Sequence, residues 1–225
     1  MIGVKQQGGD STPERGTERF LVFSPIIVIV IGSITIRLAK SWFGVWAWVP
    51  WTFVYWAMIG SLVSWGSDKM RIQRWMGPPK GRWWWSGLPF LFVLGPLAMF
   101  VSSWKLLTPV YVWLPNVVFG LTNPFFEEWY WRGLLLDATS KWPTWISVAF
   151  TTVLFTLNHP LGIGVTSLGE RHPLFLVYVT LFGFAFALTY KKTASLRFPI
   201  LAHSMADLFG ISVAVFLNLW TPPGR

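Results

Sequence analysis

Charged and imidazole side chains are scarce in the apolar stretches of this sequence, so the few that occur there are informative. Six of them lie in three apolar segments: Glu127, Glu128, Arg132, His159, His203 and Asp207. A charged group at the centre of a bilayer costs at least about 2.5–3.5 kcal/mol, so such residues usually face a cavity and pair with one another. Carboxylates and imidazoles take up and release protons when their surroundings tune them. We therefore predict a polar, proton-transferring site inside a membrane domain.

The spacing of these residues suits helices. Each of the three segments carries a pair at positions i and i+4: Glu128–Arg132, Phe155–His159 and His203–Asp207. Residues four apart lie on one face of a helix, so each helix should present a short polar stripe. Glu127 is rotated from Glu128 by about 100° around the helix axis, so we expect it to face a different direction.

The overall composition is typical of a membrane protein. Of the 225 residues, 53% are hydrophobic and only 12% are charged, whereas about 25% of the residues of a soluble domain are charged. The absence of cysteine excludes a disulfide-stapled domain, a thiol nucleophile and thiolate metal ligands. The net charge of +9 comes from Lys and Arg between apolar runs, which indicates contact with anionic lipid and no nucleic-acid partner.

Apolar runs of the length needed to cross a bilayer, about 17–25 residues, recur without the alternation typical of strands. Eight helical segments are predicted: Phe20–Leu38, Phe43–Ser64, Trp84–Ser103, Leu106–Thr122, Asn123–Ser140, Pro143–His159, Pro173–Tyr190 and Phe198–Trp220. The Asn123-Pro124 pair suits a helix start, but if residues 106–140 form one bent helix the number is seven. We predict an all-α fold, a polytopic membrane bundle of seven or eight helices over residues 20–225, preceded by a flexible polar tail over residues 1–19.

Basic residues are distributed unevenly between the loops. The loop over residues 65–83 holds five of them: Lys69, Arg71, Arg74, Lys80 and Arg82. Because cytoplasmic loops carry an excess of Lys and Arg, this pattern favours a cytoplasmic N-terminus in a multi-pass protein of the cell membrane. In this topology Glu127 and His159 lie toward the same side of the membrane, whereas His203 lies about 9 Å from the opposite side. A tilted helix, a deep loop or a broken span must bring the three together.

Three short motifs carry a resemblance to a known family. Glu127-Glu128-x3-Arg132, Phe155-x3-His159 and His203-x3-Asp207 resemble, in order and approximate separation, the motifs of the CPBP membrane proteins. This family comprises type II CAAX prenyl endopeptidases and bacteriocin-processing or immunity proteins. The resemblance covers roughly residues 120–215, which we expect to form the catalytic core.

The resemblance implies a role for each motif residue. Glu127 would be the general base, and His159 would help to position and activate the attacking water. His203 would stabilise the oxyanion. Three further residues would support the helix face or shape the substrate pocket: Glu128, Arg132 and Phe155. Alternatively, Glu128 and Arg132 would form a purely structural ion pair.

One position departs from the family pattern. The third motif most often ends in Asn, whereas this sequence has Asp207. An ionised carboxylate accepts hydrogen bonds and cannot donate one to an oxyanion. Asp207 must therefore either be protonated or orient and charge His203 so that His203 is the donor, and we expect the second.

Other interpretations of the same residues stay open. Glu127, His159 and His203 could hold zinc with a water in the fourth position, but the sequence has no local chelate such as His-Glu-x-x-His, and we predict no cofactor. The scaffold could instead serve a non-catalytic immunity or interaction protein, or a transporter with a carboxylate proton relay. The favoured function is an intramembrane endopeptidase that cuts a membrane-associated protein or peptide near the membrane surface. Residues 170–172 are expected to be solvated.

Overall fold

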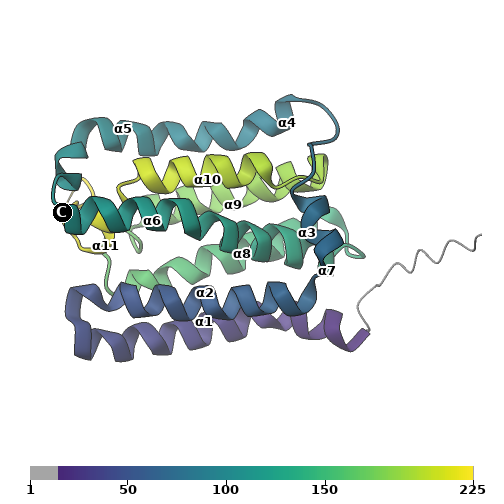
Figure 1. Cartoon of the computed structure of the whole chain (residues 1–225), viewed down its shortest axis with the longest axis horizontal. Coiled ribbons are helices and arrows are strands. Elements are labelled where there is room, and N and C mark those ends of the chain that lie inside the picture. Colours follow the sequence, from purple (N-terminus) through teal and green to yellow (C-terminus); the bar gives the residue numbers. More distant parts are fainter. Residues whose placement is uncertain (1–14, 225) are drawn as a thin grey trace, which may run out of the picture.

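Helices run back and forth along the long axis of the molecule and pack side by side (Figure 1). This computed structural model describes residues 15–224, and within them the secondary structure is helical and contains no strand. The predicted all-α fold is confirmed. Of the predicted tail, residues 1–14 lie outside the described residues, and residues 15–19 begin α1. The elements are α1 (Arg15–Phe43), η1 (Gly44–Ala47), α2 (Trp48–Gly66), α3 (Lys69–Trp75), α4 (Trp84–Gly87), η2 (Leu88–Val93), α5 (Leu94–Ser103), η3 (Trp104–Leu107), α6 (Val110–Glu127), η4 (Glu128–Leu134), α7 (Leu135–Ala138), α8 (Thr144–Leu161), η5 (Ile163–Val165), α9 (Pro173–Thr193), α10 (Arg197–Phe209) and α11 (Ser212–Phe216).

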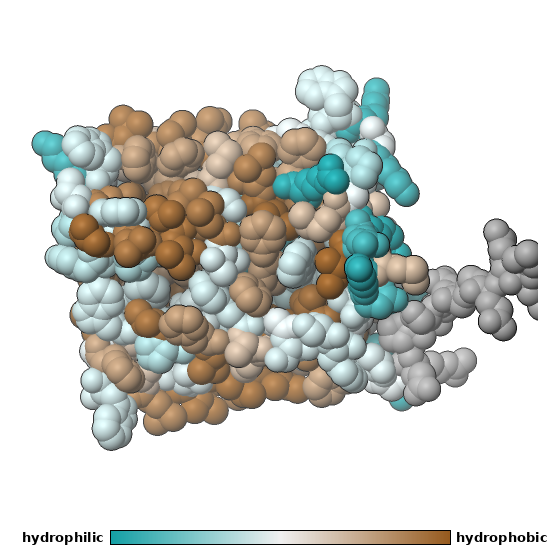
Figure 2. All heavy atoms as spheres, in the orientation of Figure 1, coloured by the Kyte–Doolittle hydropathy of each residue, from teal (hydrophilic) through white to brown (hydrophobic). Residues whose placement is uncertain are grey.

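Four segments are long and apolar enough, by length and composition, to cross a membrane. They are Gly16–Gly66, Trp84–Leu107, Thr144–Val165 and Pro173–Thr193. The first comprises α1 and α2, which turn back on each other at Gly44, where φ is +54°, and lie side by side (Figure 1). Figure 2 shows apolar side chains along the middle of the visible face and hydrophilic ones gathered at one end. The chain has the build of a membrane protein.

The first motif lies inside one long helix rather than at the start of a new one. α6 passes through Asn123 and Pro124 and continues without a break into η4 and α7. The predicted helix start at Asn123 is wrong because its side chain does not cap a backbone N–H. Its Oδ1 accepts from Trp56 Nε1 (2.9 Å) and its Nδ2 donates to Asp207 Oδ2 (3.3 Å). The segment Glu128–Leu134 is a π-helix, a wider turn that occurs often at functional sites.

The last predicted span, Phe198–Trp220, is divided into two short helices, which corrects the prediction. α10 has 13 residues, about 20 Å at 1.5 Å per residue, and the chain then turns into α11. Asn116 of α6 holds this turn. Its Oδ1 accepts from the N–H of Val213 (3.1 Å), and its Nδ2 donates to the carbonyl of Leu208 (3.2 Å). These bonds give the turn the partners that a continuing helix would have supplied.

α10 packs along α6, and the two helices approach closely at Gly120. A Cβ atom at this position would lie 2.8 Å from the side chain of Leu208. A glycine is therefore required for the approach. This contact brings the helices of the first and third motifs together.

The two ends of the bundle differ in charge. The end that carries α3, the start of α4 and the start of α10 lies at the right in Figure 1 and is rich in hydrophilic side chains in Figure 2. Its basic residues are Arg19, Lys69, Arg71, Arg74, Lys80, Arg82, Lys141, Lys191, Lys192 and Arg197. The opposite end carries fewer basic residues: Arg37 and Lys40 in the last turns of α1, Lys105 after α5, and Arg171 in the α8–α9 loop. We call these the basic end and the loop end.

Candidate active site

Glu127 and Glu128 are neighbours in sequence, yet they meet different ring nitrogens of one histidine. Glu128 Oε1 lies 2.8 Å from His203 Nδ1, and Glu127 Oε2 lies 3.5 Å from His203 Nε2. All three side chains are buried. The two glutamates thus face different directions, as predicted, and reach the same imidazole from its two nitrogens.

Glu128 belongs to an ion pair that is closed to solvent. Its Oε1 accepts a hydrogen bond from Arg132 Nη1 (3.1 Å), the i,i+4 contact that the spacing predicts. Glu128 is 0% and Arg132 is 2% exposed. The guanidinium lies 4.0 Å from the ring centroid of Phe155, a favourable cation–π arrangement. Neither charged residue lines the cavity described below, so the pair ties η4 to α8 and, through His203, to α10.

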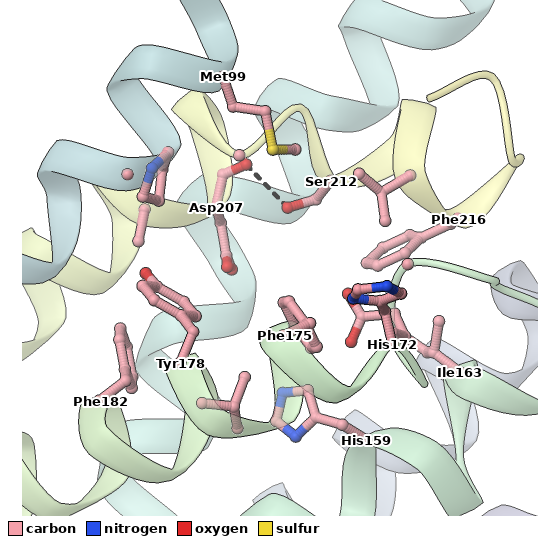
Figure 3. A pocket seen from close by; sticks show the side chains of 18 of the residues that line it. Met99, His159, Ile163, His172, Phe175, Tyr178, Phe182, Asp207, Ser212 and Phe216 are labelled. Atoms are coloured by element: carbon pink, nitrogen blue, oxygen red, sulfur yellow. Dashed lines mark hydrogen bonds between the residues drawn. The ribbon is translucent and has the colours of Figure 1, made fainter. Parts of the chain in front are cut away.

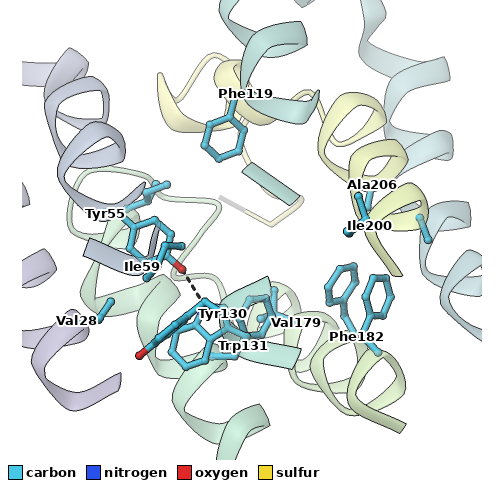
Figure 4. Packing of buried hydrophobic residues seen from close by; sticks show 14 of the residues in the cluster. Val28, Tyr55, Ile59, Phe119, Tyr130, Trp131, Val179, Phe182, Ile200 and Ala206 are labelled. Carbon is cyan, nitrogen blue, oxygen red and sulfur yellow. Dashed lines mark hydrogen bonds between the residues drawn. The ribbon is translucent and has the colours of Figure 1, made fainter. Parts of the chain in front are cut away.

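Glu127 is held from another helix. Tyr55 of α2 donates from Oη to Glu127 Oε1 (2.7 Å), and Trp131 Nε1 donates to Tyr55 Oη (2.9 Å). Figure 4 shows Tyr55 and Trp131 joined by this hydrogen bond within the apolar core. Tyr55, itself held by Trp131, fixes Oε1 of Glu127 and leaves Oε2 on the side of His203 Nε2.

Asp207 approaches the same nitrogen from α10 itself. Its Oδ1 lies 3.6 Å from His203 Nε2, as expected for the i,i+4 pair. Its Oδ2 accepts from Asn123 Nδ2, and Asn123 is fixed in turn by Trp56. Nε2 of His203 is therefore flanked by two carboxylates, and both of these line the cavity.

A cavity of about 310 Å³ extends from these groups to the loop end. Figure 3 shows His159 and Asp207 on opposite sides of it, with Phe175 and Tyr178 between them. His159 Nδ1 lies 2.9 Å from the carbonyl oxygen of Phe155. Because a carbonyl only accepts, Nδ1 carries the hydrogen and the neutral ring has its lone pair on Nε2. Within the described chain no hydrogen bond joins His159 to Glu127, but both face the same cavity.

The length of α6 explains how the three motifs meet. Glu127 ends an 18-residue helix and lies about 26 Å from its start, in the middle of the bundle rather than near one surface. His203 lies six residues into α10, whose start is at the opposite end of the bundle from the start of α6 (Figure 1). The sequence predicted Glu127 and His203 near opposite sides of the membrane because it placed a helix start at Asn123.

Several residues of the site carry no motif signal. Tyr55 lies in an ordinary apolar run. Asn123 precedes a proline, which is typical of a helix start, so the sequence gives no sign that its side chain points into the bundle. The expectation that Glu170 is solvated is wrong, since it is 7% exposed and lines the cavity. Burial, with the charges of Asp207 and Glu127 adding to it, raises the pKa of the Glu170 carboxyl well above its usual range.

The arrangement can move protons within a largely apolar cavity. Glu127 and Asp207 offer carboxylates to it, and His159 and His203 offer imidazoles. Groups of this kind accept and return protons in general acid–base chemistry. Among the described residues, no three His, Asp or Glu side chains are placed to hold one metal ion.

Comparison with known proteins finds a family model that matches part of the chain. Residues 109–209 match the family model described as type II CAAX prenyl endopeptidase Rce1-like. The match covers less than half of the chain. All seven motif residues fall within it: Glu127, Glu128, Arg132, Phe155, His159, His203 and Asp207. The predicted resemblance is confirmed, and the match supports a membrane protease of the CAAX type. No curated protein and no solved structure matches the chain.

Proposed function

We propose that this protein is an intramembrane endopeptidase that hydrolyses a peptide bond of a membrane-associated protein or peptide within the cavity that Glu127 lines. The Rce1-like match supports the kind of enzyme. The observation that carries the mechanism is the different surroundings of two adjacent glutamates. Glu128 is enclosed in an ion pair, whereas Glu127 lines a cavity that His159 also faces.

The first step is attack by water held between Glu127 and His159. Tyr55 occupies Oε1 of Glu127, so Oε2 takes the proton from the water as its oxygen bonds to the peptide carbon. The Nε2 lone pair of His159 accepts a hydrogen bond from the same water and orients it. Glu127 then returns the proton to the amine that leaves when the C–N bond breaks. Transfers of this kind typically contribute about 10²–10⁴-fold in rate.

The second element is stabilisation of the oxyanion by His203. Its Nδ1–H donates to Glu128, so donation from Nε2 requires the doubly protonated, positively charged ring. The carboxylates of Glu127, Glu128 and Asp207 around the ring favour that charge. Asp207 acts here as a positioning residue that orients and charges His203. Removal of a single oxyanion donor typically costs about 10²–10³-fold in turnover.

In this proposal the side chains act without a metal. The alternative is zinc bound by Glu127, His159 and His203, which would itself lower the pKa of the bound water. Chelation separates the two mechanisms. Cleavage that survives EDTA and 1,10-phenanthroline supports the side-chain mechanism, and cleavage lost on chelation and restored by zinc overturns it.

We further propose that the protein is a multi-pass component of the cell membrane, embedded in the lipid bilayer with its basic end in the cytoplasm. The chain has no cysteine, so single cysteines can report on each end. An impermeant maleimide added to intact cells should label Arg171→Cys at the loop end and spare Lys80→Cys at the basic end. The reverse labelling would invert the orientation.

The test of the function compares peptide ends in membranes of cells that express the wild type or Glu127→Ala at matched levels. Glu18→Ala is the control because Glu18 pairs with Lys141 at the surface, away from the cavity. New peptide ends should occur with the wild type and the control but not with Glu127→Ala. Identical ends with a folded Glu127→Ala protein would overturn the proposal and favour the non-catalytic immunity or interaction scaffold.

A further inference from the structure

The cavity contains acidic groups without a matching basic one. Glu127, Glu170 and Asp207 line it, and none of its lining residues, all within the described chain, is Lys or Arg. The neighbouring basic residue, Arg171, is exposed and does not line it. The other titratable groups of the lining are Tyr178 and histidines, among them His172 two residues after Glu170. An excess of negative charge in an enclosed space indicates a positively charged ligand.

Glu170 is the acid whose carboxylate has no partner. Its backbone N–H donates weakly to Ser167 Oγ (3.4 Å), but no described residue donates a hydrogen bond to the carboxylate or forms an ion pair with it. Glu127 and Asp207 differ in this respect, because Tyr55 and Asn123 donate to them. With 7% exposure, Glu170 is more than nine-tenths buried.

A carboxylate in this position is costly to ionise while the cavity holds no cation. Burial and the neighbouring acids raise the pKa of Glu170, and an opposite charge within about 4–6 Å would favour the ionised form again. Phe175, Tyr178 and Phe216 line the same cavity, and aromatic faces attract cations as well. The site is thus arranged to gain a charge pair when an ammonium or guanidinium group enters.

We propose that Glu170 anchors a subsite for the ammonium or guanidinium group of a Lys or Arg side chain in the substrate, with Asp207 adding to the negative charge. This inference rests on the proposed peptidase function, for which it names the substrate class. A peptide with a basic residue near the scissile bond is favoured.

The direct test measures binding of a small cation, independently of cleavage. Hexylammonium is the probe and 1-hexanol its neutral counterpart, and unfolding of the purified protein is followed by the fluorescence of its 17 Trp residues. Hexylammonium should raise the unfolding temperature of the wild type and of Glu18→Gln more than hexanol does. Glu170→Gln should bind hexylammonium at least about tenfold more weakly. Equal stabilisation by the two probes, or equal affinity in Glu170→Gln, would overturn the subsite.

Peptide ends separate this inference from the proposed function. If Glu127-dependent ends lie near Lys or Arg in the wild type and lose that bias in Glu170→Gln, both proposals are supported. If Glu127-dependent ends show no basic bias, the subsite is wrong and the peptidase stands. If no Glu127-dependent ends occur but hexylammonium binding still depends on Glu170, the peptidase is wrong and the cation site stands.

Discussion

Two layers of polar residues meet at His203, and they differ in how completely their charges are paired. The closed layer consists of Glu128, Arg132 and Phe155, where the guanidinium contacts both the carboxylate and the ring, and neither charged residue lines the cavity. The cavity layer consists of Glu127, His159, Glu170 and Asp207, whose side chains line the cavity and form no direct ion pair with Lys or Arg.

The difference shows how one helix can serve structure and chemistry with adjacent identical residues. Glu127 ends the α-helical part of the long helix, and Glu128 begins its π-helical turn. The rotation of about 100° between adjacent residues of a helix directs one carboxylate to the cavity and the other to Arg132. The closed layer fixes His203 through Nδ1, and the cavity layer is free to exchange protons with whatever enters.

The largest expected effect comes from opening the closed layer. Arg132→Ala removes the guanidinium that pairs with the buried carboxylate of Glu128, and breaking a buried pair costs about 3–5 kcal/mol. Thermal unfolding in detergent measures the loss. Arg74→Ala is the control, because Arg74 pairs with Asp137 at the surface and is 56% exposed, where pairs contribute about 0–1 kcal/mol. A loss in Arg132→Ala no larger than in Arg74→Ala would show that the closed layer is not what holds the site.

A smaller effect is expected at the boundary between the layers. Asp207→Asn removes a negative charge 3.6 Å from His203 Nε2 and keeps a side chain of the same shape. The positive form of His203 is then lost more easily, so the alkaline limb of the activity–pH profile should move to lower pH by about one unit. An unchanged profile with unchanged activity would remove Asp207 from its positioning role.

The smallest effect concerns stability and Glu170. Its pKa is raised in the folded protein by burial, so its contribution to stability is fully present below the unfolded-state pKa of about 4.3. That contribution is lost as the pH rises through the folded-state pKa. The stability of Glu170→Gln relative to the wild type should therefore increase from acidic to neutral pH. Unfolding temperatures measured across this range test the sign, and a constant difference would contradict it.

The fold class and the motif contacts could be predicted from the sequence because they depend on local periodicity. Apolar runs mark the helices, and i,i+4 spacing accounts for the Glu128–Arg132 and His203–Asp207 contacts. The helix break after α10 and the continuity of α6 could not be predicted in this way. Both depend on side chains of other segments: Asn116 bonds the turn near Leu208, and Trp56 and Asp207 engage Asn123.

The partners of the site were harder to predict for the same reason. Tyr55 reaches Glu127 across 72 positions of sequence, and nothing in its own segment sets it apart from other apolar-run residues. Glu170 lies in a polar, glycine-rich loop, and loops of this composition are usually exposed to solvent. Its burial depends on how that loop folds over the end of the bundle, against residues such as Val215.

The central claim is that Glu127 does chemistry while Glu128 maintains structure. The most direct measurement is the cleavage rate per folded molecule of Glu127→Gln, on a peptide whose Glu127-dependent cut has been mapped, with the unfolding temperature measured on the same sample. We predict that the rate falls by at least about 100-fold while the unfolding temperature stays near that of the wild type. A Glu127→Gln protein that is equally stable and cleaves at the wild-type rate would contradict the account.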